Sequence, residues 1–269
     1  MSLNSLSSVL FSSRVLGIAA VLSLCGSASA ATFSFASDDE SDAFTFLGTA
    51  GIDNNRFNMT HARTPRDRVT LKIDDNNGAR PTVSLSVGFT ASFTLNYVGS
   101  LGMANAQTHA YSVTGNFAFV DVNTGANLLT ISVTGQSPAG MTIGGTGTQW
   151  ASAGGLFGSD NLGGGSVEYT TTPALFTAGT AAGADLTQYG IFSGASAGTA
   201  AGVPDDFGFS LTFVNASGGP VGINSGTHLP TAVWNAEGSY SGSARWVPAP
   251  GTVSMLGLAG LMVGGRRRR

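Results

Sequence analysis

The chain has 269 residues, enough for one or two domains with a sizeable hydrophobic core. Charged residues make up 10% of it and the net charge is −3, whereas a chain that stays disordered needs high net charge and few apolar residues. No lysine or arginine occurs from Pro81 to Ala244. Because a surface that tracks phosphates needs clustered cations, the sequence argues against a nucleic-acid partner.

Residues 1–30 have the features of a secretory signal peptide. Arg14 is their only charged residue, and the apolar stretch from Val15 to Leu24 is too short to cross a bilayer core of about 30 Å. The segment ends with the small residues Ala28, Ser29 and Ala30. Signal peptidase accepts small side chains at the first and third of these positions, so we expect cleavage between Ala30 and Ala31.

The only cysteine, Cys25, lies within this signal segment, so the body that follows has neither a thiol nor a disulfide. A lipoprotein signal is an alternative interpretation, since Leu22 to Cys25 reads LSLC. Lipoprotein signals carry a small residue just before the cysteine, and Leu24 is bulky. The sequence therefore favours the ordinary cleaved signal.

Alternating apolar residues predict a strand over residues 82–98. The residues assigned to its apolar face are Val83, Leu85, Val87, Phe93, Leu95 and Tyr97. We expect a shift in phase near Gly88 and Phe89, where a glycine suggests a bulge or a bend between two strand segments.

A hairpin is predicted next, with arms at Phe117–Val122 and Leu128–Val133. The sequence Asn-Thr-Gly at residues 123–125 supplies the turn between them, because these residue types tolerate turn geometry.

The pattern is less regular from Gly135 to Gly202, which is rich in Gly, Ala, Ser and Thr. Long loops with one or two short strands are expected there, with a helical turn near Ala182–Tyr189. Another strand is predicted at Phe207–Val214, and Thr231–Val247 is long enough for two more.

Many short strands joined by glycine-rich turns, without strand–helix alternation, favour an all-β fold. We expect an antiparallel β-sandwich or jelly roll over residues 31–245. This body would lie between the signal peptide at residues 1–30 and a separate tail at residues 246–269.

One pentapeptide resembles a hydrolase motif. Gly194–Gly198 reads GASAG, which matches the nucleophile elbow G-x-S-x-G with Ser196 as nucleophile, and Asp205 or Asp206 and then His228 follow in the order of an α/β-hydrolase. In a chain this rich in Gly, Ala and Ser the match is expected by chance. We therefore predict a loop there, and no catalytic residue.

The sequence gives little support for a metal ion or another cofactor. His61, His109 and His228 lack metal-ligand spacing. Two acidic turns are weak calcium candidates, because carboxylate and amide oxygens suit that ion. Their residues are Asp74, Asp75, Asn76 and Asn77 in the first turn, and Asp121, Asn123 and Asn127 in the second. Such side chains also favour turns without an ion, and we expect turn chemistry alone.

Aromatic residues could form either a sugar-stacking platform or a core. Those considered are Phe33, Phe35, Phe44, Phe46, Tyr97, Trp150, Trp234, Tyr240 and Trp246. Most occupy alternating positions, which favours the core.

The last 24 residues differ in character from the body. They begin with Trp246, and the next four residues are Val247, Pro248, Ala249 and Pro250. An uncharged run from Gly251 to Gly265 follows, about 22 Å long as a helix. The chain then ends with Arg266, Arg267, Arg268 and Arg269. An apolar segment followed by arginines predicts a weak stop-transfer helix whose charged end stays cytoplasmic.

This arrangement resembles the PEP-CTERM sorting signal of exported bacterial proteins, in which a Pro-Glu-Pro motif precedes a short transmembrane helix and an arginine cluster. Pro248 and Pro250 match that motif, whereas Ala249 replaces its glutamate. The resemblance implies a Gram-negative envelope, passage through the inner membrane and processing by an exosortase-type membrane enzyme. It also implies a cell-surface or extracellular-matrix destination with exopolysaccharide as a possible partner.

These observations favour an exported structural protein of the cell surface or matrix, without catalytic activity. A carbohydrate-binding module of the matrix is the first alternative, and a secreted hydrolase is the second.

Overall fold

The computed structural model describes residues 30–36, 44–48, 56–60, 68–75, 78–159, 165–193, 196–198, 205–215 and 219–246. The strands are β1 (Ala31–Ala36), β2 (Phe44–Gly48), β3 (Arg56–Thr60), β4 (Val69–Asp75), β5 (Val83–Met103), β6 (Ala106–Val120), β7 (Asn127–Thr146), β8 (Gln149–Ser159), β9 (Ser166–Thr171), β10 (Ser196–Gly198), β11 (Asp206–Asn215) and β12 (Trp234–Ala244). The helices are α2 (Pro173–Ala181) and the 3-10 helix η3 (Leu186–Tyr189).

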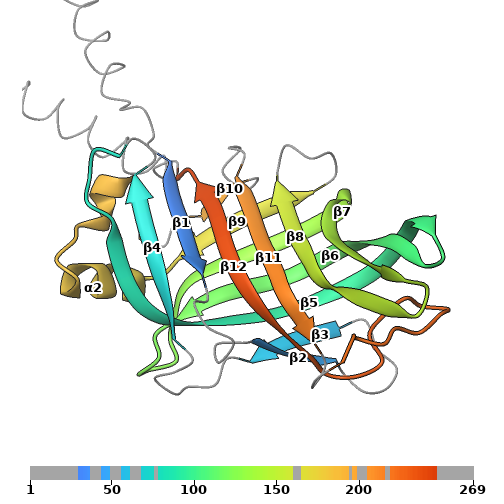
Figure 1. Cartoon of the computed structure of the whole chain (residues 1–269). Helices are drawn as coiled ribbons and strands as arrows, with labels where there is room; N and C mark the ends of the chain where they lie inside the picture. Colours follow the sequence, from blue (N-terminus) through green and yellow to red (C-terminus); the bar gives the residue numbers. More distant parts are fainter. Residues whose placement is uncertain are drawn as a thin grey trace, which may run out of the picture. The chain divides into compact units, whose positions relative to one another are not determined.

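All described strands belong to one antiparallel sheet that closes on itself. Eight strands pair in a ring, in the order β1, β4, β5, β6, β7, β8, β11, β12 and back to β1 (Figure 1). The β2–β3 pair connects β12 to β5, and β9 and β10 extend from β7. The prediction of an all-β, antiparallel body is confirmed.

The finer prediction of a sandwich or jelly roll is not what the strand pairing shows, because the strands form one continuous sheet rather than two. β5 has 21 residues and β7 has 20, much longer than the usual five or six. Such long strands can curve and twist far enough for the sheet to close, and eight strands enclose an interior that side chains can fill.

Strand β5 corrects the predicted shift in phase. Every second residue from Val83 to Leu95 is buried, so the alternation passes through Gly88 unchanged. β4 pairs with the residues before Gly88, and β6 pairs with those from Gly88 onward. The change of neighbour does not interrupt the strand. Its irregularity in pairing with β6 lies further along, between Tyr97 and Gly99.

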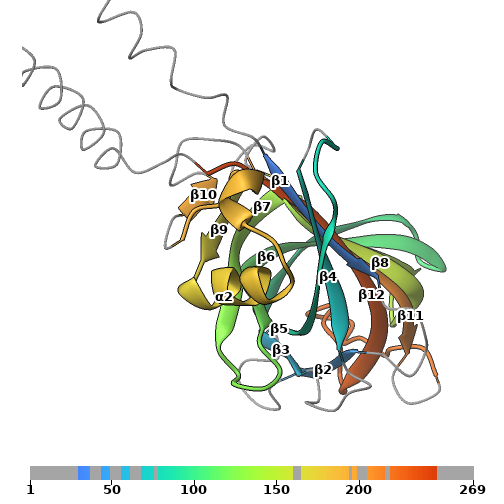
Figure 2. The ribbon, with the colours of Figure 1, turned by 90° about the vertical axis from the view of Figure 1, so that its left-hand side faces the viewer.

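The predicted β6–β7 hairpin and the strand at β11 are confirmed, and η3 matches the expected helical turn. The expectation of mostly loops from 135 to 202 is wrong, because β7, β8 and β9 cover much of that stretch. The stretch predicted to supply two strands contains one long strand, β12, among its described residues. Helix α2 follows β9 and contacts β7 and the start of β5, at one end of the ring (Figure 2).

Aromatic side chains fill the interior of the closed sheet. The ring centroid of Phe35 lies 4.9 Å from that of Phe89 and 5.8 Å from that of Tyr240. Phe46 and Trp234 stack with centroids 4.0 Å apart and planes 9° from parallel. The core interpretation of the aromatic residues is therefore correct for these rings.

Trp246 belongs to the body, although its sequence position placed it at the start of the tail. Its side chain is fully buried, and its ring packs edge-on against Phe33 and Tyr169. Its backbone forms an isolated bridge with Ala197. The folded body thus reaches at least Trp246.

Candidate functional site

The two ends of the body lie side by side. Ala31 is the first residue of β1 and pairs directly with Ala244 of β12. Ala30 is the residue before β1, and Ala31 is fully buried. The predicted cleavage site therefore lies where the folded body begins.

The other sorting residues lie outside the described part of the chain: Ala28, Val247, Pro248, Ala249, Pro250, Arg266, Arg267, Arg268 and Arg269. The predicted membrane segment at residues 251–265 also lies outside it. Among the described helices, none has the length and apolar character to cross a membrane.

The side chain of Asp121 forms hydrogen bonds within its own turn. Its carboxylate accepts hydrogen bonds from the backbone N–H of Asn123 at 2.8 Å and from the hydroxyl of Thr124 at 2.8 Å. These bonds hold the pKa of Asp121 below its usual value. Gly125 completes the turn with a φ of 73°. Asn127 lies in β7 rather than in a shared loop.

The first acidic turn is likewise occupied by protein partners. Asp74 accepts a hydrogen bond from the hydroxyl of Thr82. Asp75 accepts one from the backbone N–H of Ala79 at 3.0 Å and lies 4.0 Å from the guanidinium of Arg80. Asn76 and Asn77 lie outside the described residues. Within the described ranges, no three His, Cys, Asp or Glu side chains come together as a metal site would require.

Ser196 of the predicted elbow lies far from His228, the histidine that would act as its base. Ser196 starts the short edge strand β10, and through β9 and β7 it lies in register with Ala118 of β6. The backbone carbonyl of His228 accepts a hydrogen bond at 2.5 Å from Tyr111, which lies seven residues from Ala118 along the same strand. At 3.3 Å per residue that separation is about 23 Å, too far for a nucleophile and its base. Asp205 instead accepts a hydrogen bond from the backbone N–H of Arg245 at 3.0 Å.

A histidine–tyrosine cluster lies at the end of the sheet away from Ala31. The side chains of Tyr97, Ser100 and His109 form a chain of hydrogen bonds, with 2.7 Å between Tyr97 Oη and Ser100 Oγ and 2.7 Å between Ser100 Oγ and His109 Nδ1. His109 Nε2 lies 2.9 Å from the carbonyl oxygen of Thr146. Because a carbonyl can only accept, Nε2 carries the proton and Nδ1 accepts from Ser100.

The ring of His228 packs against this cluster. Its ring stacks on Tyr97 with centroids 4.0 Å apart, and it lies 5.5 Å from the ring of His109. Its backbone φ of 57° is unusual for a residue other than glycine, and its N–H donates to Asn224 at 2.7 Å. The cluster thus holds the loop at residues 219–233 against β5 and β6.

Burial lowers the pKa of His109, and the nearby His228 lowers it further, while the hydrogen bond to Thr146 raises it in part. Burial also raises the pKa of Tyr111. Protonation of His109 would place a charge inside this cluster, so the contact is sensitive to acid. Sequence spacing alone could have placed His109 inside, because it is in phase with Tyr111 in β6, but nothing in the sequence pointed to His228 as its neighbour.

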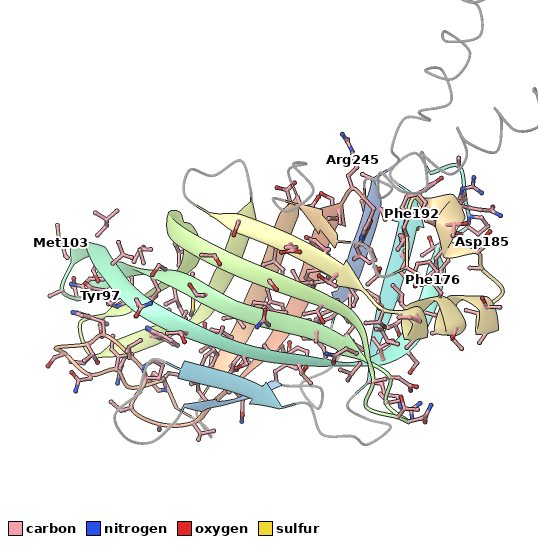
Figure 3. The ribbon with its side chains drawn as sticks, turned by 180° about the vertical axis from the view of Figure 1, so that it is seen from behind. Tyr97, Met103, Phe176, Asp185, Phe192 and Arg245 are labelled. Atoms are coloured by element: carbon pink, nitrogen blue, oxygen red, sulfur yellow. The ribbon has the colours of Figure 1, made fainter. Side chains whose placement is uncertain are left out.

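The aromatic residues lie in the core rather than on an exposed platform. All three tryptophans of the chain are buried, and of the nine aromatic residues considered, only Tyr97 is half-buried. No tryptophan is therefore exposed to form a sugar-stacking platform. Figure 3 shows Tyr97 and Met103 at the end of the sheet opposite to Asp185 and Arg245.

A groove of about 500 Å³ lies at the Tyr97 end, and we call it the tip groove. It crosses β6, β7 and β8, and its lining includes Asn105, Thr108, Thr146 and Gln149. The lining combines these amide and hydroxyl groups with apolar residues such as Trp150, and none of its residues is ionisable. The sequence alone does not reveal this groove, because its residues are isolated positions on three separate strands.

A second groove of about 550 Å³ lies between η3 and the connection from β4 to β5. Arg80 donates a hydrogen bond to Gln188 Oε1 at 2.6 Å, and its guanidinium lies 6.0 Å from the ring centroid of Tyr189. With Asp75 also nearby, the arginine attaches the helical segment to the sheet. Its charge is engaged in the fold itself.

No protein-family model matches this chain, and comparisons with curated proteins and with solved structures found none similar to it.

Proposed function

We propose that this protein is an exported structural protein of the cell surface or extracellular matrix. A cleaved signal peptide directs it through the inner membrane of a Gram-negative envelope, and a PEP-CTERM-like tail presents it to an exosortase-type membrane enzyme. The final location is the cell surface or the exopolysaccharide matrix. The proposal rests on the two terminal segments of the sequence and includes no catalytic activity for the body.

The pairing of Ala31 with Ala244 is the structural observation that best supports this proposal. The predicted signal peptide ends one residue before β1, and the predicted tail begins soon after β12. Both terminal segments therefore join the body at neighbouring strand ends. A body built in this way can be released from its signal peptide and held by its tail at the same membrane without rearranging.

The closed sheet also suits an extracellular scaffold. A ring of paired strands has no long open edge to template aggregation. Its core is aromatic and needs no disulfide, in a body that has no cysteine. The separation of Ser196 from His228 favours this structural role over the hydrolase alternative.

Replacing Arg266, Arg267, Arg268 and Arg269 with serine tests the sorting proposal. The arginines would hold the tail at the cytoplasmic face, so their loss should release the protein from the membrane fraction. Arg245→Ser is the matched control, because that side chain is exposed on the body and its backbone N–H keeps its bond to Asp205. Membrane retention of the four-serine variant equal to that of the control would contradict the proposal.

A further inference from the structure

The tip groove is open on the outer face of the sheet and has a floor of small residues. Thr108 of β6 pairs with Gly144 of β7, and a Cβ atom placed at Gly144 would lie 3.5 Å from the Cβ of Ala151 on β8. Residues directly opposite one another in an antiparallel pair share a face of the sheet. Gly144 therefore lies, without a side chain, between Thr108 and Ala151, both of which line the groove.

Two exposed aliphatic side chains border this floor. Leu101 of β5 pairs with Thr108, and Met103 pairs with Ala106, so both aliphatic side chains share the outer face with the groove. Leu101 is 81% exposed and Met103 is 78% exposed. These two side chains leave apolar area exposed to solvent beside the polar groups of the groove.

Polar groups without charge line the remainder of the groove. Thr146 pairs with Gln149 across β7 and β8, and Asn105 lies in the turn between β5 and β6. Gln107 also lines the groove, but it is in phase with the buried His109, so its side chain lies on the inner face of the sheet. Amides and hydroxyls can both donate and accept, which matches a ligand with many hydroxyl groups.

We propose that the tip groove binds a neutral saccharide chain. The volume of about 500 Å³ lies within the range of about 300–1,000 Å³ that is typical of small-molecule sites. The hydroxyls of a sugar ring would bond to the amides and threonines, and its C–H face would cover Leu101 and Met103. The absence of any ionisable residue from the lining favours a neutral sugar over a uronic acid, because no cation is present to pair with a carboxylate.

Tyr97 and Met103, at the tip-groove end of the sheet, lie opposite to Arg245 (Figure 3), which directly follows Ala244, the partner of Ala31. The tip groove therefore faces away from the strand ends at which both terminal segments join the body. The binding proposal goes beyond the proposed sorting role and does not depend on it, since a protein that is not processed by an exosortase would keep the same groove.

Ligand-observed saturation-transfer NMR on the full chain tests the proposal. The protein is kept in a polyoxyethylene detergent, because detergents with sugar headgroups would compete for the groove. The probes are neutral hexasaccharides of β-1,4-linked glucose, α-1,6-linked glucose and β-1,4-linked mannose, with a hexamer of guluronic acid as the charged comparison. We expect saturation transfer to at least one neutral hexasaccharide and at least tenfold weaker binding of the uronate. No transfer to any of the three neutral probes, or equal binding of the uronate, would overturn the proposal.

Gly144→Val locates the site. Its new Cβ has ordinary van der Waals contacts at 3.5 Å with Ala151 Cβ and at 3.9 Å with the backbone oxygen of Gln107, so the strand can accept it. The side chain would fill the floor and weaken saccharide binding at least tenfold. Gly99→Val is the matched control, since a Cβ there has no neighbour within 4 Å and Gly99 does not line the groove.

Gln149→Leu removes an amide from the tip groove with little change in side-chain size, so it tests hydrogen bonding rather than blocking of the groove. Gln188→Leu in the second groove is its control. Loss of one amide should weaken binding about tenfold at most. Unchanged binding in both Gly144→Val and Gln149→Leu, with folding intact by circular dichroism, would show that the saccharide does not bind in this groove.

Discussion

Ala31 and Ala244 are direct partners in the antiparallel pair of β1 and β12, so the first residue of β1 and the last residue of β12 lie side by side in the sheet. Ala31 is also the residue at which signal cleavage is predicted, and β1 begins there. The strand needs no residue upstream of Ala31 for this pairing. The body can therefore keep its register after the signal peptide is removed.

Ala30→Leu should block cleavage between Ala30 and Ala31, because signal peptidase accepts only small side chains at that position. The measurement is N-terminal sequencing of the protein from the periplasm or cell surface. Ser29→Leu is the control, since the position between the two small residues tolerates bulk. Normal cleavage of Ala30→Leu before Ala31 would exclude this assignment of the site.

Trp246→Ala should lower the free energy of unfolding by about 3–5 kcal/mol, the usual cost of removing a buried tryptophan. The indole is fully buried against Phe33 and Tyr169. Urea denaturation measures the change, with Arg245→Ala as an exposed neighbour that should have little effect. Equal free energies of unfolding for the two variants would contradict the assignment of Trp246 to the body and would support its assignment to the tail.

The stability of the body should fall as the pH is lowered from 7.5 to 5.5. His109 has an ordinary pKa near 6.5 in the unfolded chain and a lower pKa in the folded body. Below about pH 6.5, His109 therefore binds a proton more readily in the unfolded chain than in the folded body. The stabilisation is fully present above that pH and is lost as the pH falls, by up to about 1.4 kcal/mol per pH unit for one group.

His109→Gln should remove most of this pH dependence, because the glutamine amide can still donate to the carbonyl of Thr146 but does not titrate. Urea denaturation at the two pH values measures the difference for each protein. If the variant and the parent lose the same free energy between pH 7.5 and pH 5.5, the pH dependence comes from other groups.

Asp121→Ala should lower the free energy of unfolding by about 1 kcal/mol, because the backbone N–H of Asn123 and the hydroxyl of Thr124 lose their acceptor. Asp121→Asn keeps one acceptor oxygen and should therefore lower the free energy of unfolding by less. Thermal denaturation with calcium or with EGTA should give the same midpoint for the parent. A clear rise of that midpoint with calcium would support an ion site and contradict the turn interpretation.

How far the sequence predicts the fold is illustrated by β5 and β8. Apolar alternation in β5 marks a strand, but Gly88 suggests a break because the sequence cannot show that its hydrogen-bonding neighbour changes there. β8 has almost no alternating large residues, since it packs closely against β7. A Cβ at Gly154 of β8 would lie 3.0 Å from the Cβ of Ile143 on β7 and 3.0 Å from the backbone oxygen of Thr142, so a larger side chain does not fit there unless β7 shifts.

The sites show the same limit. The hydrogen bonds within the turn at Asp121 involve residues two and three positions apart, which makes them predictable from sequence. The contact of Tyr97 with His228 joins residues more than a hundred positions apart and depends on how the sheet closes. The terminal segments can be interpreted without knowledge of the fold, because their characteristic residues are consecutive in the sequence. The lining of the tip groove, in contrast, comes from residues on three strands.

The most direct test of the sorting account is the intact mass of the protein recovered from the surface of a Gram-negative host that carries an exosortase-type enzyme. The account predicts a surface form that begins at Ala31 and has lost Arg266, Arg267, Arg268 and Arg269. Replacing Ala249 with glutamate, which restores the usual Pro-Glu-Pro motif, should raise the yield of that form. A full chain of 27.1 kDa that begins at Met1 and stays in the cytoplasm would contradict the account.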